Sequence, residues 1–224
     1  MMTWIMKLKD KILELFPDAE PLELPSWLNQ EVSKDNSTIK SYIWKSDKIR
    51  KIRLCELDIQ NKFSAETLVI YPDFCYDVPI LGTEYLRIND KKFFGAVDLH
   101  PLRMDIDYIE KYIQKYLGDF PNRDRDTSKI YDLEKFFSKK FWIKKQSKDF
   151  YDDYSLVVEK YLKKFQSCLE EAEPVQSSYE YHKGYDTHLS TTDPAYGILK
   201  SYYDKNFAEK YISTFLFDLN PLEV

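Results

Sequence analysis

Residues 80–99 read ILGTEYLRINDKKFFGAVDL, and this stretch decides the class of fold. It holds two runs rich in β-branched and aromatic residues, Ile80–Ile88 and Lys91–Leu99, on either side of Asn89-Asp90. Such runs are typical of strands, and a short polar pair between two of them is typical of a hairpin turn. The stretch therefore predicts a pair of antiparallel strands.

Three further runs of the same kind precede this hairpin, at Ser41–Trp44, Ile49–Ile59 and Ala65–Tyr71. They are short, and turn-prone segments separate them. Most of these connections are too short to hold the crossover helix that a parallel pair of strands would need. We therefore expect one central sheet that is mainly antiparallel.

Apolar residues at helical spacing mark much of the remaining chain. The pattern predicts helices over residues 4–16, 106–117 and 154–169, from about 194, and over about 208–217. Residues 133–145 are ambiguous, because a helical start runs into residues 141–143, which also fit a last strand. Residues 174–192 are polar and are expected to form a long surface segment. A single sheet flanked by helices, an α/β fold, is the simplest architecture for this order.

The composition narrows the class of protein. The chain has 224 residues, enough to bury a full hydrophobic core. Only 5 glycines occur, whereas dinucleotide and P-loop folds need several at fixed spacing. Aromatic residues reach 16%, which indicates either a thick core or a pocket for a large flat conjugated ligand. A net charge of -5 argues against a nucleic-acid partner.

The sequence shows no segment that would place it in a membrane or export it. No apolar run approaches the roughly 18 residues of a membrane-spanning helix, and charged residues interrupt the first sixteen positions. We therefore expect no membrane association and a cytoplasmic location. The three cysteines form no close-spaced pair, so neither a disulfide framework nor a zinc site is expected.

The common catalytic motifs are absent from the sequence. It has no glycine-rich phosphate loop, no His-Glu-x-x-His pair and no nucleophile elbow. His182 and His188 are six residues apart and so do not share a helix face, while His100 stands alone. No metal site is expected from these residues.

What remains are carboxylates in apolar surroundings, and Glu84 is the first of them. Strand alternation places Glu84 on one face with Gly82 and Leu86. On the core side, its carboxyl would have a raised pKa and would hold a proton at neutral pH. On the solvent side, it would be an ordinary solvated glutamate. One strand alone does not distinguish these two interpretations.

Asp193 is the second candidate, within Ser190-Thr-Thr-Asp-Pro194. An aspartate followed by proline at the first helical position is an ordinary helix cap. The residues alone therefore favour a structural role over a catalytic one. Asp98, at the end of a predicted strand, also reads as structural.

Lysine pairs recur at residues 91–92, 139–140, 144–145 and 163–164. In an acidic chain such pairs usually form solvated faces. The functional alternatives are a docking patch for an acidic partner and anchors for ligand carboxylates.

Several segments, taken in order along the chain, resemble the ferredoxin-dependent bilin reductases. The likeness is densest at Tyr71-Pro-Asp-Phe-Cys-Tyr-Asp-Val-Pro-Ile-Leu-Gly82. It extends to residues 22–28, 41–44, 97–101, 136–138, 192–197 and 215–217. These segments span nearly the whole chain and are specific together, although no single one is.

The resemblance implies a single bilin reductase domain over residues 1–224, acting as a monomer. Its fold would be a three-layer α/β/α sandwich, with the bilin between the central antiparallel sheet and the C-terminal helices. The resemblance also implies no metal and no bound organic cofactor. A reduced [2Fe-2S] ferredoxin would supply single electrons, and protein carboxyls would supply protons to a bound bilin radical.

The resemblance assigns catalytic roles to Glu84 and Asp193. Glu84 occupies the central sheet position where most members carry an aspartate, and Asp193 matches the second, helix-side aspartate. Glutamate keeps an ionisable proton donor but extends it by one methylene, about 1.3–1.5 Å. Because a proton travels only a hydrogen-bond distance to its target, this departure puts rate and regiospecificity in question.

The resemblance also implies four substrate-binding residues. Thr67 falls where relatives carry a histidine or asparagine that contacts the bilin, and it offers only a hydroxyl. Ser138, together with Lys144 or Lys145, falls in the region that holds the propionates; this is a regional match.

Within the family, the pattern looks most like members that reduce biliverdin IXα at the C15–C16 methine bridge to 15,16-dihydrobiliverdin, in phycobilin biosynthesis. Phycoerythrobilin synthases, which carry out a four-electron reduction, are the nearest alternative. A bilin carrier with impaired turnover and a structural protein whose aromatics only fill the core also stay open. The partners implied are ferredoxin and, further, a second bilin reductase or heme oxygenase.

Overall fold

A computed structural model describes residues 5–60, 62–122 and 135–219. The strands in these ranges form one sheet in the order β1-β3-β4-β5-β6-β7-β8, with β2 paired to β3, and every pair is antiparallel. The strands are β1 (Glu20–Pro21), β2 (Glu31–Lys34), β3 (Ser37–Ser46), β4 (Ile49–Ile59), β5 (Phe63–Pro72), β6 (Ile80–Ile88), β7 (Lys92–His100) and β8 (Trp142–Gln146). The antiparallel sheet expected from the sequence is thus confirmed.

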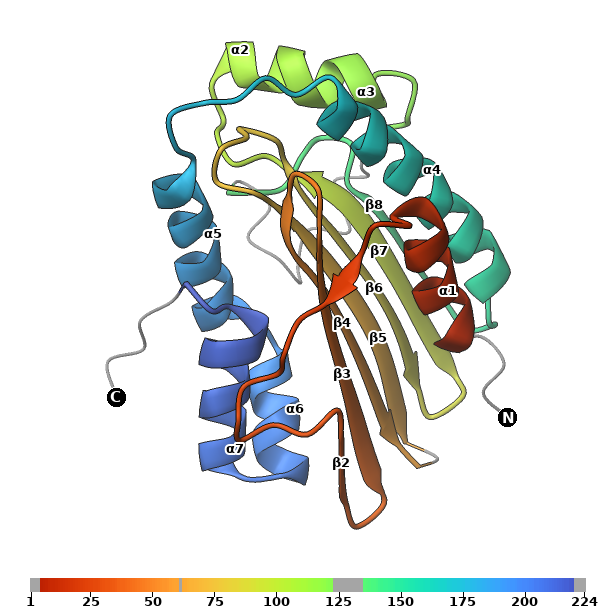
Figure 1. Ribbon diagram of the computed structural model, residues 1–224. Coiled ribbons are helices and arrows are strands. Elements are labelled where there is room, and N and C mark those ends of the chain that lie inside the picture. Colours follow the sequence, from red (N-terminus) through yellow and green to blue (C-terminus); the bar gives the residue numbers. More distant parts are fainter. Residues whose placement is uncertain (1–4, 61, 123–134, 220–224) are drawn as a thin grey trace.

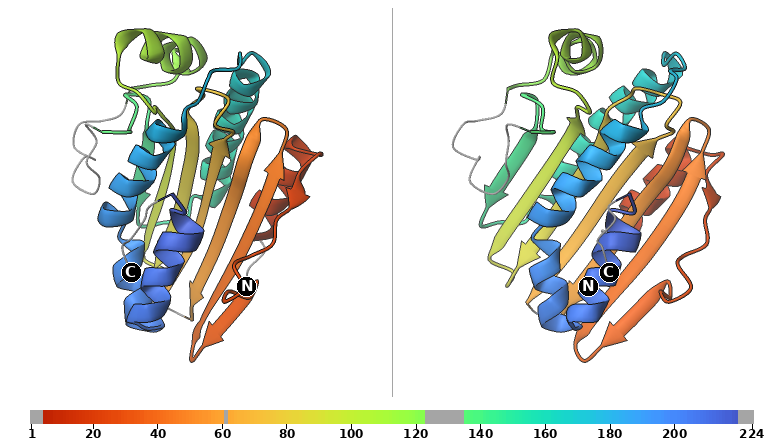
Figure 2. Two further views of the ribbon diagram at one scale, coloured as in Figure 1. Left: turned by 60° about the vertical axis from the view of Figure 1, so that its left-hand side comes forward. Right: turned by 90° about the vertical axis from the view of Figure 1, so that its left-hand side faces the viewer.

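Helices cover both faces of this sheet, as Figures 1 and 2 show. The helices are α1 (Ile5–Leu15), α2 (Ile106–Tyr108), α3 (Lys115–Leu117), α4 (Tyr151–Glu170), α5 (Tyr179–Thr192), α6 (Ala195–Tyr202) and α7 (Lys205–Lys210). Helices α1 and α4 lie on one face, and α5, α6 and α7 lie on the other. π-Helical turns link α2 to α3 and continue α7 through Tyr211–Leu216. This is the expected three-layer α/β/α sandwich.

The hairpin that opened the sequence argument has the predicted turn. Asn89 and Asp90 have φ values of 51° and 52°, and the Lys91 amide donates to the Ile88 carbonyl at 3.1 Å. Positive φ at both central positions matches the right-handed twist of the flanking strands. The turn therefore sets the register that pairs β6 with β7, from Ile88 opposite Lys92 to Ile80 opposite His100.

The structure decides the secondary structure of two segments, residues 142–146 and 174–192. Residues 142–146 form the edge strand β8, so the strand interpretation of the ambiguous segment is confirmed; residues 133 and 134 lie outside the described ranges. Residues 174–192, expected as a polar surface segment, are mostly helix α5; many of its side chains are exposed, as expected, but one face of the helix is buried. His182, Tyr185 and Asp186 are fully buried on that helix. Polar and aromatic side chains make up its buried face, so a hydropathy pattern missed it.

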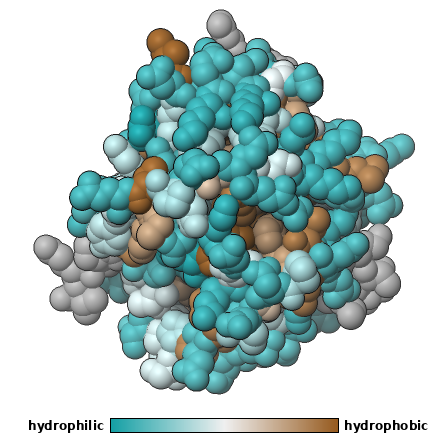
Figure 3. All heavy atoms as spheres, turned by 45° about the horizontal axis from the view of Figure 1, so that its top comes forward, coloured by the Kyte–Doolittle hydropathy of each residue, from teal (hydrophilic) through white to brown (hydrophobic). Residues whose placement is uncertain are grey.

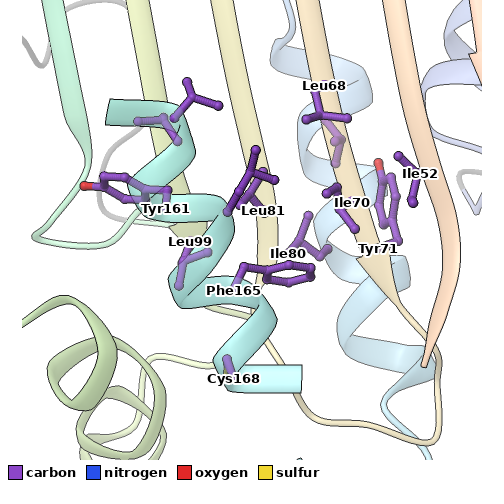
Figure 4. Packing of buried hydrophobic residues seen from close by; sticks show 14 of the residues in the cluster. Ile52, Leu68, Ile70, Tyr71, Ile80, Leu81, Leu99, Tyr161, Phe165 and Cys168 are labelled. Atoms are coloured by element: carbon purple, nitrogen blue, oxygen red, sulfur yellow. The ribbon is translucent and has the colours of Figure 1, made fainter. Parts of the chain in front are cut away.

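Each face of the sheet has its own hydrophobic cluster. Under α4, Phe165 points toward Ile80 of the sheet (Figure 4), and Tyr161, Leu81 and Leu99 belong to the same cluster. The cluster on the other face joins α6, α7 and the π-helical turn to strands β3 and β4. Alternation along each strand thus sends successive side chains into two different cores.

The outer surface is mostly hydrophilic where Figure 3 shows it, with hydrophobic side chains confined to small patches. Among the helices that the structure describes, none is long and apolar enough to span a bilayer.

Candidate active site

A pocket lies between the sheet and helices α5 and α6. Its floor is formed by alternate residues of β4, β5, β6 and β7, and its roof by α5, α6 and the residues that join them. The register arranges the floor in rows that run across the strands. The middle row contains Cys55, Thr67, Glu84 and Ala96, each directly opposite the next. Directly opposite side chains lie about 4.5–5.5 Å apart at Cβ, so these four form one continuous band.

The two flanking rows differ in polarity. On one side the row runs through Arg53, Val69 and Gly82. On the other side it runs through Leu57, Ala65 and Leu86, where Phe137 and Phe141 also line the pocket. The pocket is therefore polar at one end and apolar at the other, with Glu84 between the two. Such a shape suits a long ligand that is mainly hydrophobic and has polar groups at defined places.

Glu84 lies on the pocket side of β6. Gly82, Glu84 and Leu86 all line the pocket, so the shared face predicted from alternation is confirmed. That face is the one that helices α5 and α6 cover. The Glu84 side chain is half-buried, on a strand whose other residues are largely buried. The carboxyl thus lines a pocket in which most of the other side chains are apolar.

Asp193 is both a helix cap and a residue of the pocket lining. The sequence had offered a structural and a catalytic role as alternatives. Asp193 ends α5, and its Oδ1 accepts a hydrogen bond from the Ala195 amide at 2.7 Å, as a helix cap does. The same side chain lines the pocket from the helix side, across from the sheet that carries Glu84. Desolvation raises the pKa of Asp193 above its usual value. A raised pKa favours the protonated form that a proton donor needs.

The four residues expected to bind substrate are not all brought to the pocket. Thr67 lines it, next to Glu84. Ser138 is 1% exposed, and both its hydroxyl and its amide donate to the Asp98 carboxylate, at 2.5 and 2.7 Å. These bonds hold the loop before β8 against β7, which agrees with a structural role for Asp98.

The two lysines of β8 point to opposite sides of the sheet. Lys144 is opposite Gly95 and forms an ion pair with Asp153 of α4 at 3.5 Å, on the face away from the pocket. Lys145 is opposite Phe94, on the pocket face, and is exposed. Of this pair, only Lys145 is therefore placed to approach a ligand in the pocket.

Sequence reasoning missed His100, which also lines the pocket. Its Nδ1 lies 3.0 Å from the Phe136 carbonyl, and because a carbonyl only accepts, Nδ1 carries the proton. Burial lowers the pKa of His100 to about 4, so the ring is neutral near pH 7. Its Nε2 is then an acceptor, and it lies over Gly82. Nothing in the sequence linked these two residues, because only the β6–β7 register and the loop at Phe136 bring them together.

Gly82→Ala is expected to destabilise the protein by about 1–3 kcal/mol. A Cβ at this position would lie 2.3 Å from His100 Nε2, so the buried ring would have to move and strain its bond to Phe136. Urea unfolding of Gly82→Ala, His100→Ala and the double variant measures this effect. The double variant should be more stable than the sum of the two single effects allows. Strictly additive effects would contradict the clash.

No group of three or more metal-ligating His, Cys, Asp or Glu side chains gathers within the described ranges. The pocket offers instead two carboxyls, a neutral imidazole and a buried guanidinium around an apolar channel. Carboxyls placed in this way can donate protons to an extended, largely apolar ligand that lies in the pocket.

Comparison with known proteins identifies the enzyme class. The family model described as "Ferredoxin-dependent bilin reductase" matches residues 7–218. A 15,16-dihydrobiliverdin:ferredoxin oxidoreductase of Nostoc punctiforme is 31% identical, over 94% of this chain and 93% of its own length. An enzyme of the same name from Synechococcus sp. strain CC9605 is 28% identical, over 89% and 90%. The chain belongs to the ferredoxin-dependent bilin reductase family, and it is an oxidoreductase that uses ferredoxin as its electron donor.

A solved structure supports the fold. The phytochromobilin synthase of tomato, determined in complex with biliverdin, superimposes with a TM-score of 0.78 over 96% of this chain and 83% of its own. The two sequences are 20% identical, so this likeness concerns the fold alone.

Proposed function

We propose that this protein reduces biliverdin IXα to 15,16-dihydrobiliverdin. The C15=C16 double bond becomes a single bond by gaining two electrons and two protons. Reduced [2Fe-2S] ferredoxin supplies the electrons one at a time, and carboxyls of the pocket supply the protons. The relatives that carry this name, and match nearly the whole chain, support the choice of substrate and product.

The observation that supports the proposal is the position of Glu84 in the middle row of the pocket floor, with Asp193 in the lining on the helix side. A bilin lying on the sheet would have Glu84 near its central pyrroles. Glu84 would donate a proton there, and a neutral radical would form after the first electron arrives. Asp193, whose pKa is raised, would donate a second proton or hold the pyrrole nitrogens. Thr67 and Lys145 would contact the ligand from the floor and from the edge strand.

Two alternatives to this function stay open. The first is a bilin carrier with impaired turnover. The resemblance implies a histidine or asparagine at the position of Thr67 and an aspartate at that of Glu84, and both departures favour this alternative. Reduction of the product by two further electrons, to phycoerythrobilin, would use the same pocket. Four further points stay predictions. These are a cytoplasmic location, a monomeric state, a single domain over residues 1–224, and transfer of the bilin to a second reductase or from heme oxygenase.

An anaerobic assay with biliverdin IXα, ferredoxin, ferredoxin reductase and NADPH tests the proposal. Ferredoxin-dependent loss of the biliverdin absorbance and a blue-shifted product are expected, and chromatography should identify 15,16-dihydrobiliverdin. Conversion to phycoerythrobilin would favour the four-electron alternative. A stable biliverdin complex without any reduction would favour the carrier.

Turnover under ferredoxin-limited conditions is expected to fall as ionic strength rises above about 0.15 M, where charges are screened beyond roughly 8 Å. Exposed lysines such as Lys91, Lys92 and Lys139 would steer an acidic ferredoxin. Lys140 does not contribute, because its Nζ donates to the Gly118 and Phe120 carbonyls at 3.0 and 2.7 Å. Initial rates measured across a salt series check this, with biliverdin affinity as the control. A rate that is independent of salt would argue against electrostatic docking.

A further inference from the structure

Arg53 is a buried cation that forms no ion pair with the residues that the structure describes. Its side chain, on β4, is only 4% exposed. Among the described residues, its Nε has no hydrogen-bond partner and no carboxylate forms an ion pair with its guanidinium. Taking a charge out of water is costly unless an opposite charge or strong acceptor meets it.

The other arginines of the described ranges are arranged differently. Each of them pairs with two carboxylates: Arg50 with Asp186 and Asp218, Arg87 with Asp58 and Asp90, and Arg103 with Asp77 and Asp105. All three are more exposed than Arg53. Of the four arginines in the described ranges, the most buried one, for which a missing ion pair is most costly, is thus the one that forms none.

The surroundings of Arg53 direct it toward the pocket. It lines the pocket, in the row that continues through Val69 and Gly82. The Phe217 ring lies 5.7 Å from its Cζ, and the charge of Asp193 acts on it without an ion pair. The protein therefore closes around this guanidinium and leaves it facing the ligand space.

We infer that Arg53 binds the substrate, by donating hydrogen bonds to an oxygen that carries negative charge. This inference rests on the proposed function, which supplies a bilin with two sources of such oxygens, the propionate carboxylates and the lactam carbonyls. The planar guanidinium suits either one. Arg53 lies one row, about 7 Å along the strand, from the row of Glu84. An oxygen held at Arg53 would therefore fix which part of the ligand lies over the Glu84 carboxyl.

The test compares Arg53→Met, which keeps the aliphatic stem and removes the charge, with Arg87→Met as the matched control. Absorbance titration with biliverdin IXα should show Kd at least ten-fold weaker for Arg53→Met and unchanged for Arg87→Met. Arg53→Lys, which keeps a charge but loses the fork, should recover part of the affinity. Repeating the titration with biliverdin dimethyl ester separates the two oxygens. A loss that persists with the ester assigns the lactam carbonyl, and a loss that disappears assigns a propionate.

Thermal unfolding of the ligand-free protein separates ligand binding from a purely structural role. Removing a buried charge that has no ion pair should not lower the Tm, and we expect the Tm of Arg53→Met to exceed that of the wild type by up to about 2–4 °C. A lower Tm combined with unchanged affinity for both ligands would overturn the inference, while the proposed function would stand. If the wild-type protein fails to bind biliverdin at micromolar concentrations, the proposed function falls, and the inference falls with it.

Discussion

Glu84→Gln is expected to lower ferredoxin-dependent reduction of biliverdin by about 10²–10⁴-fold, the usual contribution of a general acid. Glutamine has nearly the same shape and keeps a polar head in the centre of the pocket floor, but it has no acidic proton to give. Biliverdin affinity should therefore change by only a few-fold. The protonation that precedes the first electron would be lost, and with it the build-up of the neutral radical. Stopped-flow absorbance with electron paramagnetic resonance would follow the radical and the product.

Glu66→Gln is the matched control for this experiment. Glu66 immediately precedes Thr67 on β5, but its side chain points to the opposite face, toward α4, where Tyr151 donates to its Oε2 at 3.0 Å. Its replacement should leave turnover unchanged at a given pH. Asp193→Asn tests the second carboxyl under the same conditions, because asparagine keeps the acceptor that caps α6. Full activity in Glu84→Gln would rule out Glu84 as the essential proton donor.

The second large effect concerns stability, and Glu66 causes it. This carboxyl is 1% exposed, its Oε1 has no hydrogen-bond partner among the described residues, and Glu56 lies directly opposite on β4. Desolvation raises the pKa of Glu66 to about 8 from 4.5. The charge of Glu56 adds to this rise, and the hydrogen bond from Tyr151 opposes it. Desolvation likewise raises the pKa of Glu56 to about 7. The folded protein therefore keeps a proton on Glu66 that the unfolded chain releases above pH 4.5.

Stability should accordingly fall as pH rises from about 4.5 to about 8, because the folded state binds more protons over this range. The buried histidines act at lower pH. Burial lowers the pKa of His100 to about 4 and that of His182 to about 3, so they destabilise the fold only as pH falls below 6.5. Between pH 6.5 and 8.5 Glu66 causes most of the fall in stability. Lys51 opposes it near pH 8, because burial lowers the pKa of its amine to about 8 from 10.5 and the unfolded chain then binds more protons at this group.

Glu66→Gln is expected to remove most of this slope and to stabilise the protein at pH 8.5 by about 2–4 kcal/mol relative to the wild type. The amide stays neutral at every pH and still accepts the Tyr151 bond. Urea unfolding at pH 6.5, 7.5 and 8.5 measures the effect. Glu180→Gln, an exposed site on α5, serves as the control and should leave the slope intact. If Glu66→Gln kept the wild-type slope, Glu66 would have to be ionised in the folded protein.

The pocket floor shows how far sequence reasoning reached. Alternation grouped Gly82, Glu84 and Leu86 on one face, because the period of a strand is a local property. The choice of face is not local, since it depends on which helices cover each side. The link between Thr67 and Glu84 came from the register of β5 with β6, which no single strand contains.

The roof and the loops show where sequence reasoning failed. Helix α5 buries a histidine and an aspartate, and its composition reads as a surface segment. Ser138 and Lys144 fall in the region that resembles a propionate site, yet one is bound to Asp98 and the other faces α4. A one-residue difference along a strand reverses the direction of a side chain, so a regional likeness cannot assign it.

The sequence by itself therefore determined the antiparallel sheet, its hairpin turn, most of its helices and, through resemblance, the family, because these depend on local pattern and residue order. Only the tertiary structure decided which side of the sheet holds the pocket, that Asp193 and Glu84 line the same pocket, and that His100 and Arg53 line it too. The physical reason is burial. Register and helix packing remove these groups from water and set their neighbours, and those neighbours determine their charge, their hydrogen bonds and their chemistry.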